Sequence, residues 1–211
     1  MLDRYFGAEA EARVERAVRE AEARSLGQIV PVVVEKSDGY PEAVYRGALL
    51  LGSLATAVVL LLPWPAPLGE LVLLQLAAGS LGALLARLDP VERLLAGRRA
   101  MEAATRARAM RAFQEHGLDR TVQGTGVLVF ASLFEHRAVV LGDHGIHARM
   151  GDAEWARAVN ALAGGLQRGD PAAGFCEAIA LVGERLAEHF PRSGGTGPGN
   201  ELPDALRPSR N

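Results

Sequence analysis

The chain of 211 residues contains a single cysteine, Cys176, so no disulfide can form within it and nothing in the composition indicates an oxidising compartment. Its apolar neighbours favour a buried structural thiol over a reactive one. An excess of basic residues is also missing: 23 Lys and Arg against 25 Asp and Glu give a net charge of −2. This balance argues against nucleic-acid binding. The apolar core of a secretory signal is absent near the N-terminus, which is charged from Asp3 onward.

Lysine and arginine are absent between Gly47 and Ala86. Two apolar runs, Gly47–Leu62 and Leu68–Leu88, cover this interval and are separated by the Pro-rich segment 63–67; Arg87 is next to the end of the second run. Two such runs joined by a tight turn predict a transmembrane hairpin in the lipid bilayer. The alternative is a pair of buried helices in a soluble bundle, which the polar residues Glu70 and Gln75 would favour.

Positive charge flanks the predicted hairpin on both outer sides. Arg46 precedes the first run, and Arg87 lies at the outer end of the second, whereas the turn around Trp64 carries no positive charge. Since cytoplasmic flanks are rich in Lys and Arg, we expect a multi-pass protein of the cell (inner) membrane with both termini in the cytoplasm. An indole such as that of Trp64 suits the headgroup level on the far side.

An arginine-rich segment follows the second run. Asp89, Pro90 and Glu92 form a strong helix start, and the helix is predicted to run to about His116 and to stop at Gly117. One interpretation is an interfacial helix held by anionic lipids; the other is an ordinary solvated arginine face. The basic residues concerned are Arg87, Arg93, Arg98, Arg99, Arg106, Arg108 and Arg111.

The remaining pattern predicts a small α/β domain. A helix over Glu9–Arg24 precedes a buried strand, Gln28–Glu35, in which Pro31 indicates an edge position or a bulge. Two further strands, Gly126–Phe134 and Arg137–Leu141, form a β-hairpin. Because a lone strand leaves its backbone groups unpaired, we expect one sheet to be assembled from both parts of the chain.

The predicted fold class is therefore α/β, an α+β sandwich in which a small mixed sheet is packed by helices and interrupted by the two-helix transmembrane hairpin. Asp152 and Asp170 are expected to cap the last two helices, the second of which ends near His189. The predicted organisation is an N-terminal part of the domain over residues 1–42, the hairpin over 43–88, the basic helix with the C-terminal part over 89–190, and a disordered tail, rich in Gly, Pro and Ser, over 191–211.

Titratable side chains gather in one loop after the predicted β-hairpin: Asp143, His144, His147 and Asp152. Two carboxylates with backbone carbonyls could hold Ca²⁺, and two histidines with carboxylates could hold a transition metal, although the spacing matches no standard motif. The alternative is a surface loop in which Asp152 caps a helix. We take Asp143, Asp152 and His147 as the candidate metal ligands. Ser132 has no base beside it in the sequence, so no catalytic triad can be argued.

Three segments resemble the TPM domain: Ser25–Val30, Gly126–Val140 and the loop Gly142–Ile146. With a transmembrane hairpin between them, the chain is similar, over about residues 5–190, to short bacterial membrane proteins of this family. The resemblance implies an α/β sandwich. Some relatives bind calcium through acidic loop residues, plant relatives are linked to photosystem II repair, and acid phosphatase activity has been proposed for them.

The carry-over of family residues is partial. Asp152 falls where the related loop usually has aspartate, whereas His147 and Gln28 fall where relatives usually have glutamate, which removes two hard oxygen ligands. The sequence contains no complete catalytic motif. We therefore expect a non-enzymatic binding or accessory module with a membrane or cytoplasmic protein partner. The alternative, a metal-dependent, phosphatase-like hydrolase, rests on the resemblance and on the Asp143/Asp152 loop.

Overall fold

The structure is a computed structural model, and it describes residues 5–62, 67–121, 124–147, 149, 151–192 and 204–209. The chain divides into two compact units. One combines residues 1–37 with 103–211 and is called the α/β unit below; the other, residues 38–102, is called the helical unit. The predicted turn at residues 63–66, including Trp64, lies outside the described part.

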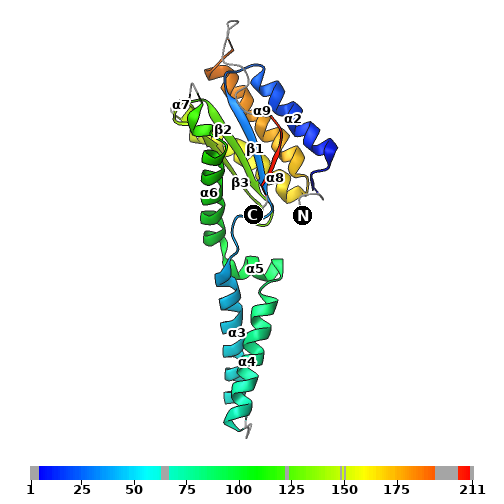
Figure 1. Cartoon of the computed structure of the whole chain (residues 1–211), viewed down its shortest axis with the longest axis vertical. Coiled ribbons are helices and arrows are strands. Elements are labelled where there is room, and N and C mark those ends of the chain that lie inside the picture. Colours follow the sequence, from blue (N-terminus) through cyan, green and yellow to red (C-terminus); the bar gives the residue numbers. More distant parts are fainter. Residues whose placement is uncertain are drawn as a thin grey trace. The chain divides into compact units, whose positions relative to one another are not determined.

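The α/β unit is built on a four-stranded sheet in the order β3-β2-β1-β4 (Figure 1). Strands β1 (Gln28–Val34) and β2 (Gly126–Ser132) pair in parallel, and β2 pairs antiparallel with β3 (Arg137–Gly142). The fourth strand, β4 (Arg207–Ser209), runs parallel to β1. The predictions of a β-hairpin, and of one sheet assembled from both parts of the chain, are therefore confirmed.

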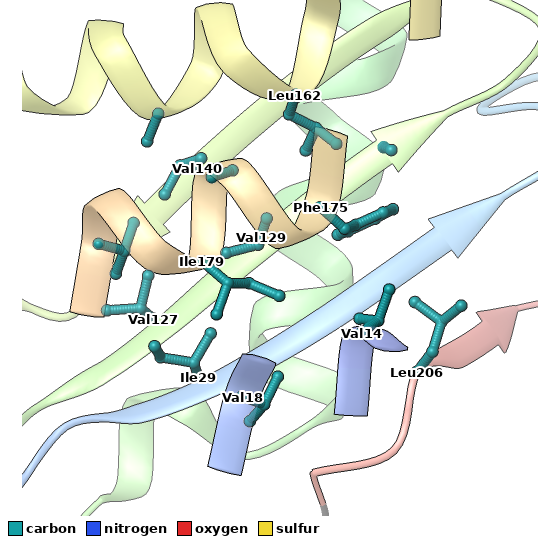
Figure 2. Close-up of a cluster of buried hydrophobic side chains, with 14 of the residues drawn as sticks. Val14, Val18, Ile29, Val127, Val129, Val140, Leu162, Phe175, Ile179 and Leu206 are labelled. Atoms are coloured by element: carbon teal, nitrogen blue, oxygen red, sulfur yellow. The ribbon is translucent and has the colours of Figure 1, made fainter. Parts of the chain in front are cut away.

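Helices cover both faces of this sheet (Figure 1). Helices α2 (Ala8–Glu22), α8 (Asp152–Arg168) and α9 (Pro171–His189) pack on one face, and α6 (Arg98–Glu115) packs on the other through its second half. Because strand side chains alternate between faces, each face receives every second residue. The first core includes Val14, Val18, Ile29, Val127, Val129, Leu162, Phe175 and Ile179 (Figure 2), and the second includes Val30, Val32, Leu128, Phe130, Ala112 and Phe113.

Pro31 lies where the first half of β1 has no strand on its outer side among the described residues. The N–H of Gln28 donates to the Thr125 carbonyl beside β2 at 3.0 Å, so the odd-numbered residues of β1 direct their N–H groups away from β2. Strand β4 reaches only Val32–Val34. Since proline has no N–H, its position on this outer side leaves no donor unpaired, and the prediction of an edge position is confirmed for the first half of the strand.

The prediction of a disordered tail is wrong for residues 207–209, which form β4. The polar composition of the tail predicted disorder, but a single apolar side chain anchors this segment. Leu206 is 7% exposed and joins the core between the sheet and α2. The backbone of Val32–Val34 also offers an open edge, which an extended segment can pair with. Leu206 lies close to Val14 of α2 in Figure 2.

The prediction of one continuous basic helix is also wrong. The segment forms two helices, α5 (Asp89–Ala96) and α6 (Arg98–Glu115), which are separated at Gly97. Gly97 has φ +83° and ψ 151°, a backbone conformation that interrupts the helical ladder and that side-chain-bearing residues rarely adopt. The predicted stop is confirmed, because Gly117 has φ +69° and follows the end of α6.

The helical unit contains two long apolar helices, α3 (Pro41–Leu61) and α4 (Leu68–Leu85). By length and composition both could cross a membrane. They approach closely at glycines: a Cβ added to Gly47 would lie 2.6 Å from the carbonyl oxygen of Gly82. Beside this contact, Arg46 donates from its guanidinium to the carbonyls of Leu95 and Ala96 at the end of α5, where a cation is favoured.

The contact between α8 and α9 generates a stability prediction. A Cβ added to Gly165 would lie 2.5 Å from the Cα of Gly174, so Gly165→Ala forces two backbones apart and should lower the free energy of unfolding by about 1–3 kcal/mol. Denaturant unfolding of a Trp64→Phe chain, followed by the fluorescence of the buried Trp155, measures the change.

The adjacent glycine supplies a matched control. A Cβ at Gly164 meets only the far end of the Arg168 side chain, at 3.1 Å, so Gly164→Ala should raise stability by about 0.5–1 kcal/mol through helix propensity. Equal effects of the two substitutions would contradict the close contact of α8 with α9.

Candidate functional site

The predicted loop begins at Asp143, directly after β3 ends. Its backbone N–H donates to the Gly126 carbonyl at 2.8 Å, which fixes the residue beside β2. The carboxylate oxygen Oδ1 accepts from the N–H of His144 at 2.6 Å and lies 2.8 Å from Nδ1 of the His144 ring. The short helix α7 (His144–His147) follows, with the N–H of Ile146 donating to the Asp143 carbonyl at 3.0 Å.

The second carboxylate oxygen of Asp143, Oδ2, is buried and has no hydrogen-bond partner within the described structure. Gly124 lies beside it: an added Cβ would be 3.6 Å from Oδ2 and 3.1 Å from a carbon of the His144 ring. The glycine therefore leaves space next to a buried acceptor. A buried carboxylate oxygen without a donor is costly, and a cation is one way to satisfy it.

The other two predicted ligands cannot be placed against Asp143, because the side chains of His147 and Asp152 lie outside the described part of the structure. Within that part, no group of three His, Cys, Asp or Glu side chains could hold a metal ion. His144 is available to solvent, since 90% of its side chain is exposed. The described residues thus supply one fitting carboxylate, and the convergence of Asp143, His147 and Asp152 stays a prediction.

Helix capping near this loop is described only in part. Gly151 precedes α8, and its N–H donates to the Glu154 carboxylate at 3.1 Å. The capping prediction for Asp170 is confirmed, because its carboxylate accepts from the N–H of Ala173 at 3.0 Å. The corresponding role of the Asp152 side chain stays a prediction.

Ser132 does have an acidic neighbour, which sequence reasoning missed. Its hydroxyl donates to Glu135, and the other carboxylate oxygen of Glu135 accepts from the N–H of Ser37 at 2.9 Å. Both Ser132 and Glu135 are buried, so this hydroxyl is not open to a substrate. The signal in the sequence was an acidic residue in the tight turn between two predicted strands, the first of which is buried throughout. Glu135 joins the β2–β3 turn to the segment that follows β1.

Glu22, near the end of the helix predicted over Glu9–Arg24, is a second buried acid. Its Oε1 accepts from the N–H of Ile29 at 2.7 Å, on the outer edge of β1. Burial raises the pKa of Glu22 to about 7, against the lowering effect of the Ile29 hydrogen bond. The negative charge of Asp204, and a side-chain hydrogen bond that protonated Glu22 donates to it, raise the pKa further, and Arg192 lowers it. Glu22 therefore favours its protonated form beside Asp204.

The lone cysteine is partly buried and packs against the first core. Burial raises the pKa of the Cys176 thiol, while Arg13 acts in the opposite direction. A raised thiol pKa disfavours the nucleophilic thiolate, which agrees with the interpretation as a structural residue.

Among the arginines of α6, Arg108 differs from the others because it is buried and pairs with Glu115 at 3.1 Å. It therefore cannot contribute to an anionic-lipid surface. Arg98, Arg99, Arg106 and Arg111 are exposed.

Comparisons with known proteins agree with this architecture. The TPM domain family matches residues 93–185, somewhat less than half of the chain. The solved NMR structure of the BA42 protein from the psychrophilic bacterium Bizionia argentinensis is similar with a TM-score of 0.60, at 20% sequence identity and covering 99% of each chain. The chain has a TPM-like fold. No curated protein matches it.

The predicted fold class, a small mixed sheet packed by helices, is confirmed by this structure and by its TPM-like neighbour. At 20% identity the likeness shows the fold alone, and it assigns no ligand or activity.

The Glu135 contacts generate the second prediction. Glu135→Ala leaves the buried Ser37 N–H and Ser132 hydroxyl without this acceptor, which should lower the free energy of unfolding by about 2–4 kcal/mol. Denaturant unfolding measures this loss. The control is Glu177→Ala, which removes an exposed pair with Arg168 and should cost no more than about 1 kcal/mol. A Glu135 variant as stable as this control would show that the buried contacts do not contribute to the free energy of unfolding.

Proposed function

We propose that the chain is an integral membrane protein of the inner membrane whose α/β unit is a binding or accessory module for a membrane or cytoplasmic protein. Helices α3 and α4 form the membrane hairpin. The observation that carries the proposal is the apolar surface of these helices, which no described part of the helical unit covers.

Large apolar side chains point outward along both helices. Leu60 is 80% exposed on α3, and Leu73 is 68% exposed on α4. A continuous apolar surface of this kind is unfavourable in water and is favourable in hydrocarbon. Glycine contacts such as Gly47 with Gly82 are typical of helices that associate within a bilayer.

Charge supports the proposed orientation. Arg46 lies near the start of α3, and Arg87 follows the end of α4, so both are at the ends nearest the termini. With both of these ends cytoplasmic, the exposed Arg98, Arg99 and Arg106 would be available to anionic lipid headgroups.

Single-cysteine labelling tests both insertion and orientation. In a Cys176→Ser chain, we introduce Leu68→Cys at the start of α4 or Asp119→Cys in the 3₁₀ helix Leu118–Arg120, both at exposed positions. A membrane-impermeant maleimide added to intact spheroplasts should label Leu68→Cys directly. It should label Asp119→Cys only after the membrane is permeabilised.

The reverse labelling pattern would overturn the orientation while leaving insertion intact. Release of the unmodified chain from membranes by alkaline carbonate would overturn insertion itself, because a transmembrane hairpin resists that extraction.

A second candidate function rests on the unpartnered Oδ2 of Asp143: a divalent cation, Ca²⁺ in particular, held by Asp143 with backbone carbonyls and with Asp152 and His147 as further ligands. A metal-dependent, phosphatase-like hydrolase would build on this site. Oxygen ligands of this kind suit a hard cation such as Ca²⁺.

Calorimetric titration of the detergent-solubilised chain with CaCl₂ tests the cation site. We expect binding that is lost in Asp143→Asn, which keeps an acceptor for the His144 N–H but removes the charge, and that is weakened in Asp152→Ala. Asp119→Asn removes an exposed carboxylate elsewhere and should bind as the unmodified chain does. Absence of heat at millimolar Ca²⁺ would remove this candidate, and phosphomonoester hydrolysis unchanged in Asp143→Asn would remove the hydrolase.

A further inference from the structure

Residues 204–206 lead into β4, which pairs with the outer edge of β1 from Arg207 onward, and the side chains of Leu206 and Arg207 lie on opposite faces of the sheet. Leu206 packs into the core on the α2 face, close to Val14 (Figure 2). Arg207, the next residue, contacts His116 after the end of α6, on the opposite face. Backbone pairing in parallel with β1 begins at Arg207, opposite Val32, and continues to Ser209. The segment is therefore held by the backbone of residues 207–209 and by the side chains of Asp204, Leu206 and Arg207.

The first of these side chains, Asp204, contacts Glu22. The Glu22 carboxylate already satisfies the N–H of Ile29 at 2.7 Å, which is the outward-facing donor of β1 just ahead of Pro31. A second carboxyl group at Glu22 is repelled when both are ionised and is held by a hydrogen bond when one is protonated. The nearby Arg192 is the cation that faces this pair.

The third side chain, Arg207, donates from its guanidinium to Nδ1 of His116, with a nitrogen–nitrogen distance of 2.7 Å. This contact requires a neutral imidazole, because a protonated one has no lone pair to accept with and repels the arginine. Partial burial and the charge of Arg207 lower the pKa of His116, with Arg108 acting in the same direction and Glu115 in the opposite one. The imidazole is therefore held in its accepting form near neutral pH.

We propose that the outer edge of β1, with Glu22 on one face and His116 on the other, is a binding site for an extended peptide of the pattern Asp-x-Leu-Arg. In this structure the chain's own residues 204–207 occupy the site as a reversible ligand. Occupancy is linked to a proton on Glu22. A partner protein that presents the same pattern in an extended segment would compete for the same edge by strand addition.

This site lies wholly in the α/β unit, so its test does not depend on whether α3 and α4 insert into a membrane. The proposal rests on the proposed function in one respect: it gives the proposed binding module a defined class of ligand. Failure of peptide binding and failure of membrane insertion are separate outcomes of separate experiments.

The direction of the pH dependence follows from Glu22. Its pKa is about 7 in the occupied state, chiefly because of burial and then because of Asp204, and we expect it to fall toward 4.5 when Asp204 leaves and water enters. Binding therefore takes up a proton, is fully supported below about pH 4.5, and weakens as the pH rises to about 7. From pH 6 to pH 8 this linkage alone lowers affinity about tenfold. Protonation of His116 in the empty site at the lower pH opposes it, so we expect a loss of about three- to tenfold.

The experiment uses the full chain in detergent with Leu206→Asp, which places a charge in the apolar slot and releases the chain's own segment. A fluorescent peptide of residues 201–211 is titrated at pH 6 and pH 8 and followed by anisotropy. The matched control peptide carries the same Leu206→Asp change. We expect the native peptide to bind more tightly at pH 6, and the control peptide not to bind.

Glu22→Gln in the same chain tests whether the pH dependence of binding comes from protonation of Glu22. The new amide oxygen can still accept from the Ile29 N–H, and the amide nitrogen can donate to an ionised Asp204, so the peptide should bind without the loss between pH 6 and pH 8. Equal binding of native and control peptides would overturn the proposal. The same pH dependence in the chain that keeps Glu22 and in the chain with Glu22→Gln would overturn it too.

Hydrogen exchange in the unmodified sequence supplies a measurement that does not require releasing the segment by mutation. The N–H of Val33 faces β4 by the alternation of β1, so its protection reports occupancy of the edge. After correction for the intrinsic rate, protection should fall from pH 6 to pH 8 in the unmodified chain and should not fall in Glu22→Gln. Protection independent of pH in both chains would contradict proton-linked binding.

Discussion

Parallel pairing of β1 with β2 is the constraint on which the α/β unit depends. Every residue of both strands is buried, and the two strands supply most of the side chains on both faces of the sheet. Neither strand could form this sheet alone, because β1 has no other partner of its own length among the described residues and the β2–β3 hairpin would expose one edge. The helical unit is inserted between the two strands, so it must leave their pairing intact.

Two buried acids complete this arrangement at opposite ends of β1. Glu22 accepts from the N–H of Ile29 near the start of the strand, and Glu135 accepts from the N–H of Ser37 just after its end. Both donors lie where the sheet ladder does not supply an acceptor, and an unpaired buried N–H is costly. The need to pair these N–H groups explains why two glutamates are tolerated inside the unit. The two differ in their surroundings, because Glu135 accepts from two donors whereas Glu22 faces another carboxyl group.

Much of the fold follows from patterns that the sequence displays directly. Helical spacing predicted α2, β-branched density predicted β1, and the Asp170–Pro171 pair predicted the start of α9. The errors arose where one residue outweighs the composition around it, as Gly97 does in the basic segment and Leu206 does in the tail. Of the candidate site, sequence spacing identified Asp143 but missed Glu22 and Glu135. Their importance comes from contacts with backbone groups distant in the chain, which no local pattern encodes.

Pro31 has a consequence for synthesis as well as for the finished sheet. The hydrogen bond between Ser37 and Glu135 joins residues 98 positions apart, and β1 likewise waits for β2, so at about 5–20 residues per second several seconds pass before its partner exists. During that time Gln28–Val34 is an apolar, β-branched segment of the kind that aggregates. A proline at its centre removes a donor and prevents that segment from stacking into an uninterrupted ladder with copies on neighbouring ribosomes. The residue that costs the native strand nothing thus protects the nascent chain.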